Sequence, residues 1–148
     1  MSSTAKIKSH LLLQAQLLEH EGFRSSAYED SLGFLTIGIG RMIDAKRGGG
    51  ITAEEALYLL ANDIAKVERQ LYERLPWWRG LDEVRQRVLL DMAFNLGIVG
   101  LLGFKGTLQA VQEGRYGDAA DGMLESLWAQ QVGRRAQRLA LMMRTGQP

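Results

Sequence analysis

The chain has 148 residues, 46% of them hydrophobic, which is the size of one ordinary domain and enough to bury a core. Its formal net charge is +1, so no overall field attracts nucleic acid, and we expect no nucleic-acid partner. The sequence contains no cysteine, which excludes disulfides and thiolate metal sites. His10 and His20 form no ligand cluster, so we expect each to be solvated or ion-paired, with no metal and no cofactor needed.

The N-terminal residues 1–10 are polar and basic, and we expect them to lead loosely into a first helix. The leucine-rich run that follows is interrupted by Gln14 and Gln16. It is far shorter than the roughly 20 residues that span a bilayer, and no cleavage-site pattern follows it. We therefore expect no signal peptide and no stable membrane insertion. The leucine spacing instead predicts the buried face of a helix that ends by Gly22, formed by Leu11, Leu13, Leu17 and Leu18.

The stretch from Glu19 to Arg41 turns from this helical run into glycines, a turn and a short apolar strand. It contains Glu21, Asp30 and Thr36, with eight residues between the first two and five between the last two. A compact helix-turn-hairpin unit would therefore bring two carboxyls and a hydroxyl around one cleft. Cleavage of a glycosidic bond uses one protonated carboxyl for the leaving oxygen and a second, ionised one that attacks or activates water. The pattern predicts a glycosidase active site.

The three side chains have different predicted environments. Glu21 follows the leucines at a helix end, where partial burial would keep its proton in place, so it is the predicted acid. Asp30 lies in a polar turn, where a solvated carboxylate stays ionised, so it is the predicted base or nucleophile. The hydroxyl of Thr36 points to one face of the strand and could hold a water beside Asp30. Each residue alone also fits a structural role, as a helix-end charge, a turn former and a strand residue; the combination carries the prediction.

The order E-G at 21–22, Y-x-D at 28–30, G at 33 and T-I-G-I-G at 36–40 resembles the catalytic region of the phage-type lysozymes. These are the muramidases of glycoside hydrolase family 24, in which a Glu, an Asp and a Thr at this spacing form the catalytic set. The resemblance implies those roles for Glu21, Asp30 and Thr36. Arg41 is a departure, because many members have a histidine there that forms an ion pair elsewhere in the fold.

The middle of the chain predicts a loop and then a long helix. Residues 41–50 are basic and rich in glycine, which favours a solvated loop. Thr52 and Glu55 have the spacing of a capping box. The apolar residues that follow recur at steps of three and four until Pro76, which predicts a helix of about six turns that can join two lobes. These apolar residues are Leu57, Leu60, Ile64, Val67 and Leu71.

The remainder of the chain is predicted to be helical, with no second sheet. An apolar face along 81–96 predicts a buried helix that Gly97 and Gly100 end. The family has a polar side chain lining the cleft at the position of Asn95, which could equally be a satisfied core amide. The segment 128–146 resembles the family's closing segment, which has a Trp, a Gln and an Arg that meets the catalytic Glu. Substrate-binding roles are thus expected for Asn95, Gln131 and Arg135.

A guanidinium of Arg135 near Glu21 would favour the charged carboxylate and oppose its role as acid. Burial or substrate binding must therefore offset this effect.

The resemblance covers about 11–146 and implies an α+β, mostly α, lysozyme-like fold with two lobes. We expect a single domain over 1–148, with a small mixed lobe carrying a β-hairpin at about 11–51, a connecting helix at 52–75 and a larger helical lobe at 76–146. The expected partner is bacterial peptidoglycan, cleaved by a monomer at the β-1,4 bond between N-acetylmuramic acid and N-acetylglucosamine, with inversion. Synthesis in the host cytoplasm and action in the periplasm or cell wall, causing cell lysis, are also implied.

Two alternatives stay open at this stage. A lytic transglycosylase needs only one acid/base carboxyl and gives an anhydro product, so Asp30 would be dispensable. A non-catalytic cell-wall-binding module would need neither carboxyl.

Overall fold

The computed structural model describes residues 2–148 and divides into two compact units. The first unit ends at Leu57, and the second unit is Tyr58–Pro148. The chain is mostly helical, with one small antiparallel sheet in the first unit. This confirms the predicted α+β, mostly α fold class. The predicted lobe boundaries within a single domain stay a prediction.

The first helix, α1, is Ser3–Glu21. It starts earlier than expected, because the Ser2 hydroxyl accepts a hydrogen bond from the Ala5 N–H and caps the helix N-terminus. The prediction of a loose N-terminal lead is therefore wrong. The helix ends where predicted, since Gly22 has a φ of 73°, a left-handed conformation that glycine adopts readily.

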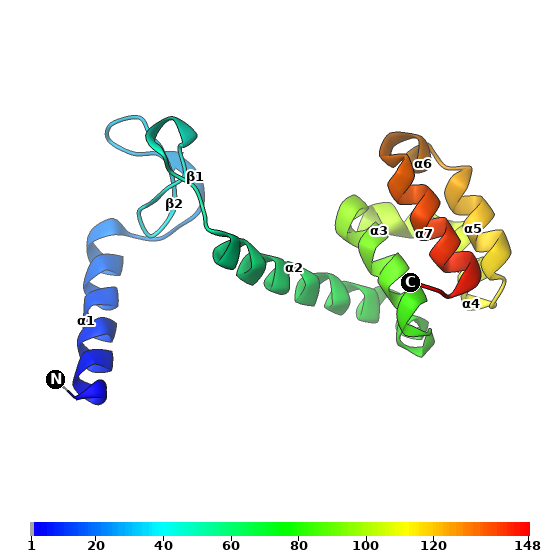
Figure 1. Cartoon of the computed structure of the whole chain (residues 1–148), viewed down its shortest axis with the longest axis horizontal. Coiled ribbons are helices and arrows are strands. Elements are labelled where there is room, and N and C mark those ends of the chain that lie inside the picture. Colours follow the sequence, from blue (N-terminus) through cyan, green and yellow to red (C-terminus); the bar gives the residue numbers. More distant parts are fainter. Residues whose placement is uncertain (1) are drawn as a thin grey trace. The chain divides into compact units, whose positions relative to one another are not determined.

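The leucines of α1 do not form the predicted buried face. No residue of this helix is buried, and exposure rises from 43% at Leu17 to 60% at Leu11. The reason lies in the first unit itself, where α1 extends away from the sheet and no other described element of that unit covers its length (Figure 1). The apolar spacing predicted the helix correctly but not its burial.

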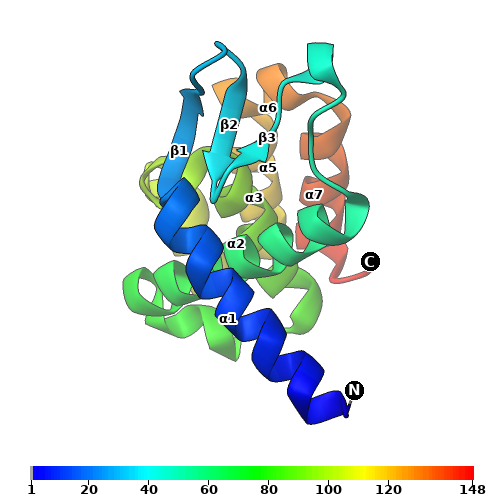
Figure 2. The ribbon, with the colours of Figure 1, turned by 90° about the vertical axis from the view of Figure 1, so that its left-hand side faces the viewer.

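Three antiparallel strands follow: β1 (Arg24–Glu29), β2 (Leu35–Gly38) and β3 (Arg41–Met42). They form one sheet in the order β1-β2-β3, seen side by side in Figure 2. Thr36 on β2 pairs with a residue of each neighbouring strand, Tyr28 and Met42. The loop predicted over 41–50 contains β3 and a short 3-10 helix, η1 (Ala45–Arg47).

Helix α2 (Ala53–Arg74) begins in the first unit and continues in the second. Its predicted capping box is confirmed: the Thr52 N–H donates to Glu55 Oε1 over 3.0 Å, and the Glu55 N–H donates to Thr52 Oγ1 over 3.1 Å. The helix ends before Pro76, as predicted. Its apolar face is buried only toward the C-terminal end, at Val67 and Leu71.

The second unit is helical throughout its described residues. It contains η2 (Pro76–Gly80), α3 (Glu83–Leu102), α4 (Lys105–Gln112), α5 (Tyr116–Leu124), α6 (Leu127–Val132) and α7 (Arg134–Thr145). Figure 1 shows α3 to α7 gathered around one another, with α5 packed against α4 and α7. The largest fully buried side chains are Leu71, Val88, Leu89, Met92, Leu101, Val111, Met123 and Met143.

Helix α3 breaks at Gly97, whose φ of 76° and ψ of 160° are not helical. This confirms a helix break at the predicted position. Helical turns resume afterwards and continue to Leu102, so the prediction that Gly100 ends the helix is wrong.

Arg85 of α3 holds the end of α7 in place. Its Nε donates to the carbonyl of Met143 over 2.7 Å, and its Nη2 donates to the carbonyl of Arg144 over 3.2 Å. These donors satisfy carbonyls that a helix C-terminus leaves without intrahelical partners. The guanidinium also lies over the ring of Tyr116, with Cζ 3.6 Å from its centroid. These contacts of Arg85 hold the C-terminal end of α7 against α3.

Within residues 2–148, no single helix is long and apolar enough to cross a membrane; α3 and α4 meet that test only as a pair bent by 105°.

Candidate active site

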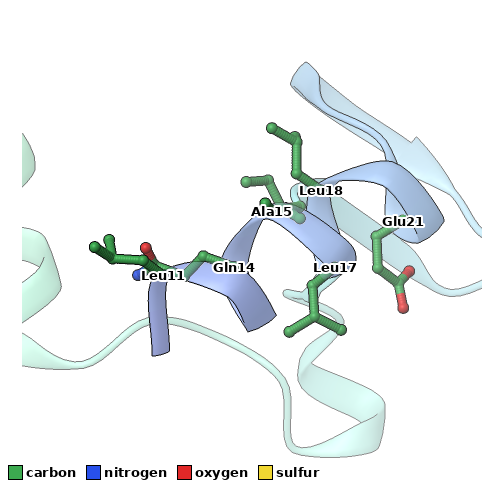
Figure 3. Close-up of a pocket in the computed structure, with 7 residues that line it drawn as sticks. Leu11, Gln14, Ala15, Leu17, Leu18 and Glu21 are labelled. Carbon is green, nitrogen blue, oxygen red and sulfur yellow. The ribbon is translucent and has the colours of Figure 1, made fainter. Parts of the chain in front are cut away.

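Glu21 is the last residue of α1, and its side chain is exposed. The predicted partial burial is therefore wrong, because the last turn of α1 lies at the surface of the first unit. Figure 3 shows Glu21 projecting to the same side of the helix as Leu17, one turn earlier. A concavity of about 660 Å³ adjoins this face. It is lined by Leu11, Gln14, Ala15, Leu17, Leu18, Glu21 and Ile39.

The carboxylate of Glu21 also approaches the hairpin. A β-carbon placed on Gly40 would lie 2.8 Å from Glu21 Oε2, so the carboxylate lies against the backbone between β2 and β3. The sequence contained a signal for this contact, because glycine beside a strand often marks a close approach by another group.

Asp30 forms the predicted turn. Its Oδ1 accepts hydrogen bonds from the N–H groups of Leu32 and Phe34, each over 2.9 Å. Its own N–H donates to the Phe34 carbonyl over 2.9 Å. Within residues 2–148, no hydrogen bond to Asp30 Oδ2 is present. Oδ1 thus stabilises the turn, and Oδ2 is available to accept a proton or a hydrogen bond.

Thr36 is the only buried residue among the described residues of the first unit, at 4% exposure. Its Oγ1 donates to the Phe34 carbonyl over 3.0 Å. Asp30 and Thr36 are therefore both hydrogen-bonded to the backbone of Phe34, which holds the predicted base and the predicted hydroxyl in a fixed local geometry. The hydroxyl proton is engaged, and the oxygen keeps lone pairs that can accept a hydrogen bond.

Arg41, the departure from the family pattern, forms an ion pair with Glu55 at the start of α2. The backbone N–H of Thr52 contributes most to holding the pKa of Glu55 below its ordinary value. Burial opposes this shift, while the Thr52 hydroxyl and the Arg41 guanidinium add to it. The pair links β3 to the capping box within the first unit.

Asn95 and Gln131 belong to the second unit. Asn95 Oδ1 accepts a hydrogen bond from the indole Nε1 of Trp128 over 2.8 Å. Trp128 is buried, and its ring meets the ring of Phe104 edge to face. The amide nitrogen of Asn95 has no hydrogen-bond partner within the described residues. Gln131 on α6 is exposed. The oxygen of Asn95 therefore accepts a hydrogen bond from a core tryptophan, while the amide nitrogen of Asn95 remains available.

Arg135 on α7 binds Asp91 on α3. Both its Nε and its Nη2 reach Asp91 Oδ1, over 2.8 Å and 2.7 Å. Sequence reasoning did not single out Asp91, although a lone acid in the apolar run LLDMAF was an available signal. The pair lines a basic concavity of about 620 Å³, together with Arg87, Arg134, Arg138, Leu139, Met142 and Pro148.

In residues 2–148, no group of three or more His, Cys, Asp or Glu side chains is arranged to hold a metal ion. The expectation of a reaction without metal or cofactor stays a prediction.

A mostly helical fold with one small antiparallel sheet, and two carboxyls and a hydroxyl around its hairpin, is typical of lysozyme-type glycoside hydrolases. The family model described as phage lysozyme matches residues 18–145, and the chain belongs to this family. At the family level it is a glycoside hydrolase, a muramidase that acts on peptidoglycan. The predicted resemblance is therefore confirmed.

The curated proteins that are similar to the chain include one phage protein and two proteins of an amoeba. The pre-baseplate central spike protein Gp5 of Enterobacteria phage T4 is 30% identical over 162 residues, covering 93% of this chain and 28% of that protein. The chain thus spans just over a quarter of the spike protein's length. Probable T4-type lysozyme 1 of Dictyostelium discoideum is 27% identical, covering 85% of this chain and 89% of that protein. Probable T4-type lysozyme 2 of the same organism is 24% identical, with 90% and 94% covered.

Proposed function

We propose that the chain hydrolyses the β-1,4 bond between N-acetylmuramic acid and N-acetylglucosamine of peptidoglycan, with Glu21 as acid and Asp30 as base. Family membership supports the substrate class. The observation that carries the proposal is the difference between the two carboxylate oxygens of Asp30. Oδ1 accepts the hydrogen bonds of the turn, and Oδ2 accepts none from the described residues. A residue that served the turn alone would need only the first of these oxygens.

In the proposed reaction, Glu21 donates its proton to the glycosidic oxygen as the bond to the anomeric carbon breaks. A water attacks that carbon, gives one proton to Asp30 Oδ2 and donates its other hydrogen to the Thr36 oxygen as a hydrogen bond. The donation from Thr36 to the Phe34 carbonyl fixes the orientation of this oxygen. Attack by water from the opposite face of the sugar gives inversion, which we propose on the resemblance of the catalytic spacing.

We further propose that Asn95, Gln131 and Arg135 bind the substrate. The free amide group of Asn95 can donate to an acetamido carbonyl of the glycan, and exposed Gln131 can do the same. Arg135 is one of four arginines that line a concavity with a single aspartate, and such an excess of positive charge suits the carboxylates of wall peptides.

The proposed setting rests on the resemblance to the phage-type lysozymes. The enzyme is made in the host cytoplasm and acts as a monomer in the periplasm or cell wall, where cleavage of the glycan lyses the cell.

The test is turbidity clearing of Gram-negative cells with permeabilised outer membranes, followed by mass spectrometry of the released muropeptides. We expect wild-type protein to clear the cells and to release reducing muramic ends, while Glu21→Gln is inactive. Glu19→Gln, two residues earlier on the same exposed helix, is the matched control and should remain active.

Two outcomes would contradict the proposal. Anhydro sugars among the products would identify a lytic transglycosylase. No clearing by wild-type protein, with retained wall binding, would identify a binding module.

A further inference from the structure

Two glycines at the turn between β2 and β3 share an unusual backbone conformation. Gly38 has a φ of 70° and Gly40 a φ of 71°. Both lie in the left-handed region, where a side chain strains the backbone and glycine does not. Replacement of either glycine by alanine should therefore impose a similar backbone strain.

The space beside the two glycines differs. A β-carbon on Gly38 would meet nothing within 4 Å. A β-carbon on Gly40 would lie 2.8 Å from Oε2, 3.0 Å from Cδ and 3.3 Å from Cγ of Glu21. The end of the Glu21 side chain thus occupies the space that the missing side chain of Gly40 leaves open.

We propose that Gly40 is a positioning residue that sets the place of the Glu21 carboxylate, an inference that rests on the proposed role of Glu21 as acid. Glu21 is exposed at a helix end, and among the described residues of the first unit no hydrogen bond or ion pair to its carboxylate is present. Within this unit, the approach to Gly40 is therefore the contact that limits where the Glu21 carboxylate lies.

The consequence of a side chain at residue 40 follows from which group can move. The carboxylate is the far end of a flexible side chain, whereas the Gly40 backbone is held between two paired strands. The carboxylate would move away, and proton donation requires it within hydrogen-bond reach of the leaving oxygen. A misplacement of about 1 Å can cost on the order of 10²-fold in rate.

The experiment compares Gly40→Ala with Gly38→Ala in the full chain. We measure kcat and KM on soluble glycan strands and the carboxyl ¹³C signal of Glu21, assigned by its loss in Glu21→Gln. We expect Gly40→Ala to lower kcat on the order of 10²-fold with little change in KM, and to shift the Glu21 signal. Gly38→Ala should leave both the kcat and the signal close to wild type.

Three results would overturn the inference: an equal fall in kcat for both variants, an unmoved Glu21 signal in Gly40→Ala, or a rise in KM alone. If wild-type protein does not cleave glycan at all, the proposed function fails, while the ¹³C comparison still decides whether Gly40 places Glu21. If the alanine variants do not fold, Gly40→Asn and Gly38→Asn replace them, because asparagine adopts left-handed φ more readily.

Discussion

Different interactions stabilise each of the two units of this protein. In the first unit, Thr36 is the only buried residue among those described, and backbone hydrogen bonds and left-handed glycines determine the local geometry. The second unit contains the hydrophobic core, with fully buried leucines, methionines and valines on successive helices. The proposed acid and base belong to the unit with little core.

Residues that stabilise the fold and residues proposed for the reaction thus lie in different units. Substitutions in the core should change the free energy of unfolding, and substitutions of Glu21 or Asp30 should change turnover. Four substitutions, each with a measurement of stability, test this division.

Leu89→Ala should cause the largest loss of unfolding free energy. Leu89 on α3 is fully buried, and removal of such a side chain costs about 2–5 kcal/mol of unfolding free energy. Leu12→Ala on α1 is the matched control, because Leu12 is 64% exposed, and it should cost far less. Urea denaturation measures both. Similar losses of unfolding free energy for the two leucines would contradict the expected difference between the two units.

Asn95→Ala should cause the second largest loss of unfolding free energy. It removes the acceptor of the indole N–H of buried Trp128, and an unsatisfied buried donor costs about 1–3 kcal/mol. Gln131→Ala changes an exposed amide and should leave the free energy of unfolding nearly unchanged. Urea denaturation measures both variants, and the chemical shift of the Trp128 indole proton reports on the bond. An unchanged stability in Asn95→Ala would show that water replaces the amide.

Glu55→Gln should remove a pH-dependent contribution to the first turn of α2. The pKa of Glu55 is lower in the folded protein than its ordinary value, so its stabilisation is fully present above that ordinary value and is lost as pH falls through the lowered pKa. Hydrogen exchange of the amides at the start of α2 measures this effect. We expect protection in wild type to fall with acid and the variant to show a weaker fall. Parallel curves for the two proteins would refute the role of the Glu55 charge.

Asp91→Asn should have the smallest effect on stability. The Asp91–Arg135 pair is exposed on both sides, and such pairs contribute about 1 kcal/mol or less. The difference from wild type in urea denaturation should shrink further as salt is added. A loss that salt does not reduce would mean that the pair is more than a surface contact.

Local sequence patterns predicted the local parts of this structure. The capping box of Thr52 and Glu55, the end of α1 at Gly22 and the turn at Asp30 each depend on residues within a few positions of one another. Because nearby side-chain and backbone groups decide these features, a single sequence was enough to predict them.

The features that were missed depend on contacts between distant residues. The spacing of the α1 leucines predicts a helix face but does not say whether another element covers it. The partner of Arg135 is 44 positions away, and the approach of Glu21 to Gly40 depends on how the hairpin folds back. The glycine at residue 40 and the lone acid in LLDMAF are local signals, but neither identifies the residue that it contacts.

The substitution Asp30→Asn separates the two roles proposed for the Asp30 carboxylate. Asparagine keeps the Oδ1 acceptor for the N–H groups of Leu32 and Phe34, and replaces the free Oδ2 by an amide that cannot accept a proton from water. We predict that turnover of glycan falls about 10²–10⁴-fold, the usual contribution of a general base, while the urea midpoint stays unchanged. Turnover near wild type, or a midpoint that falls together with turnover, would contradict the assignment of Asp30 as the base.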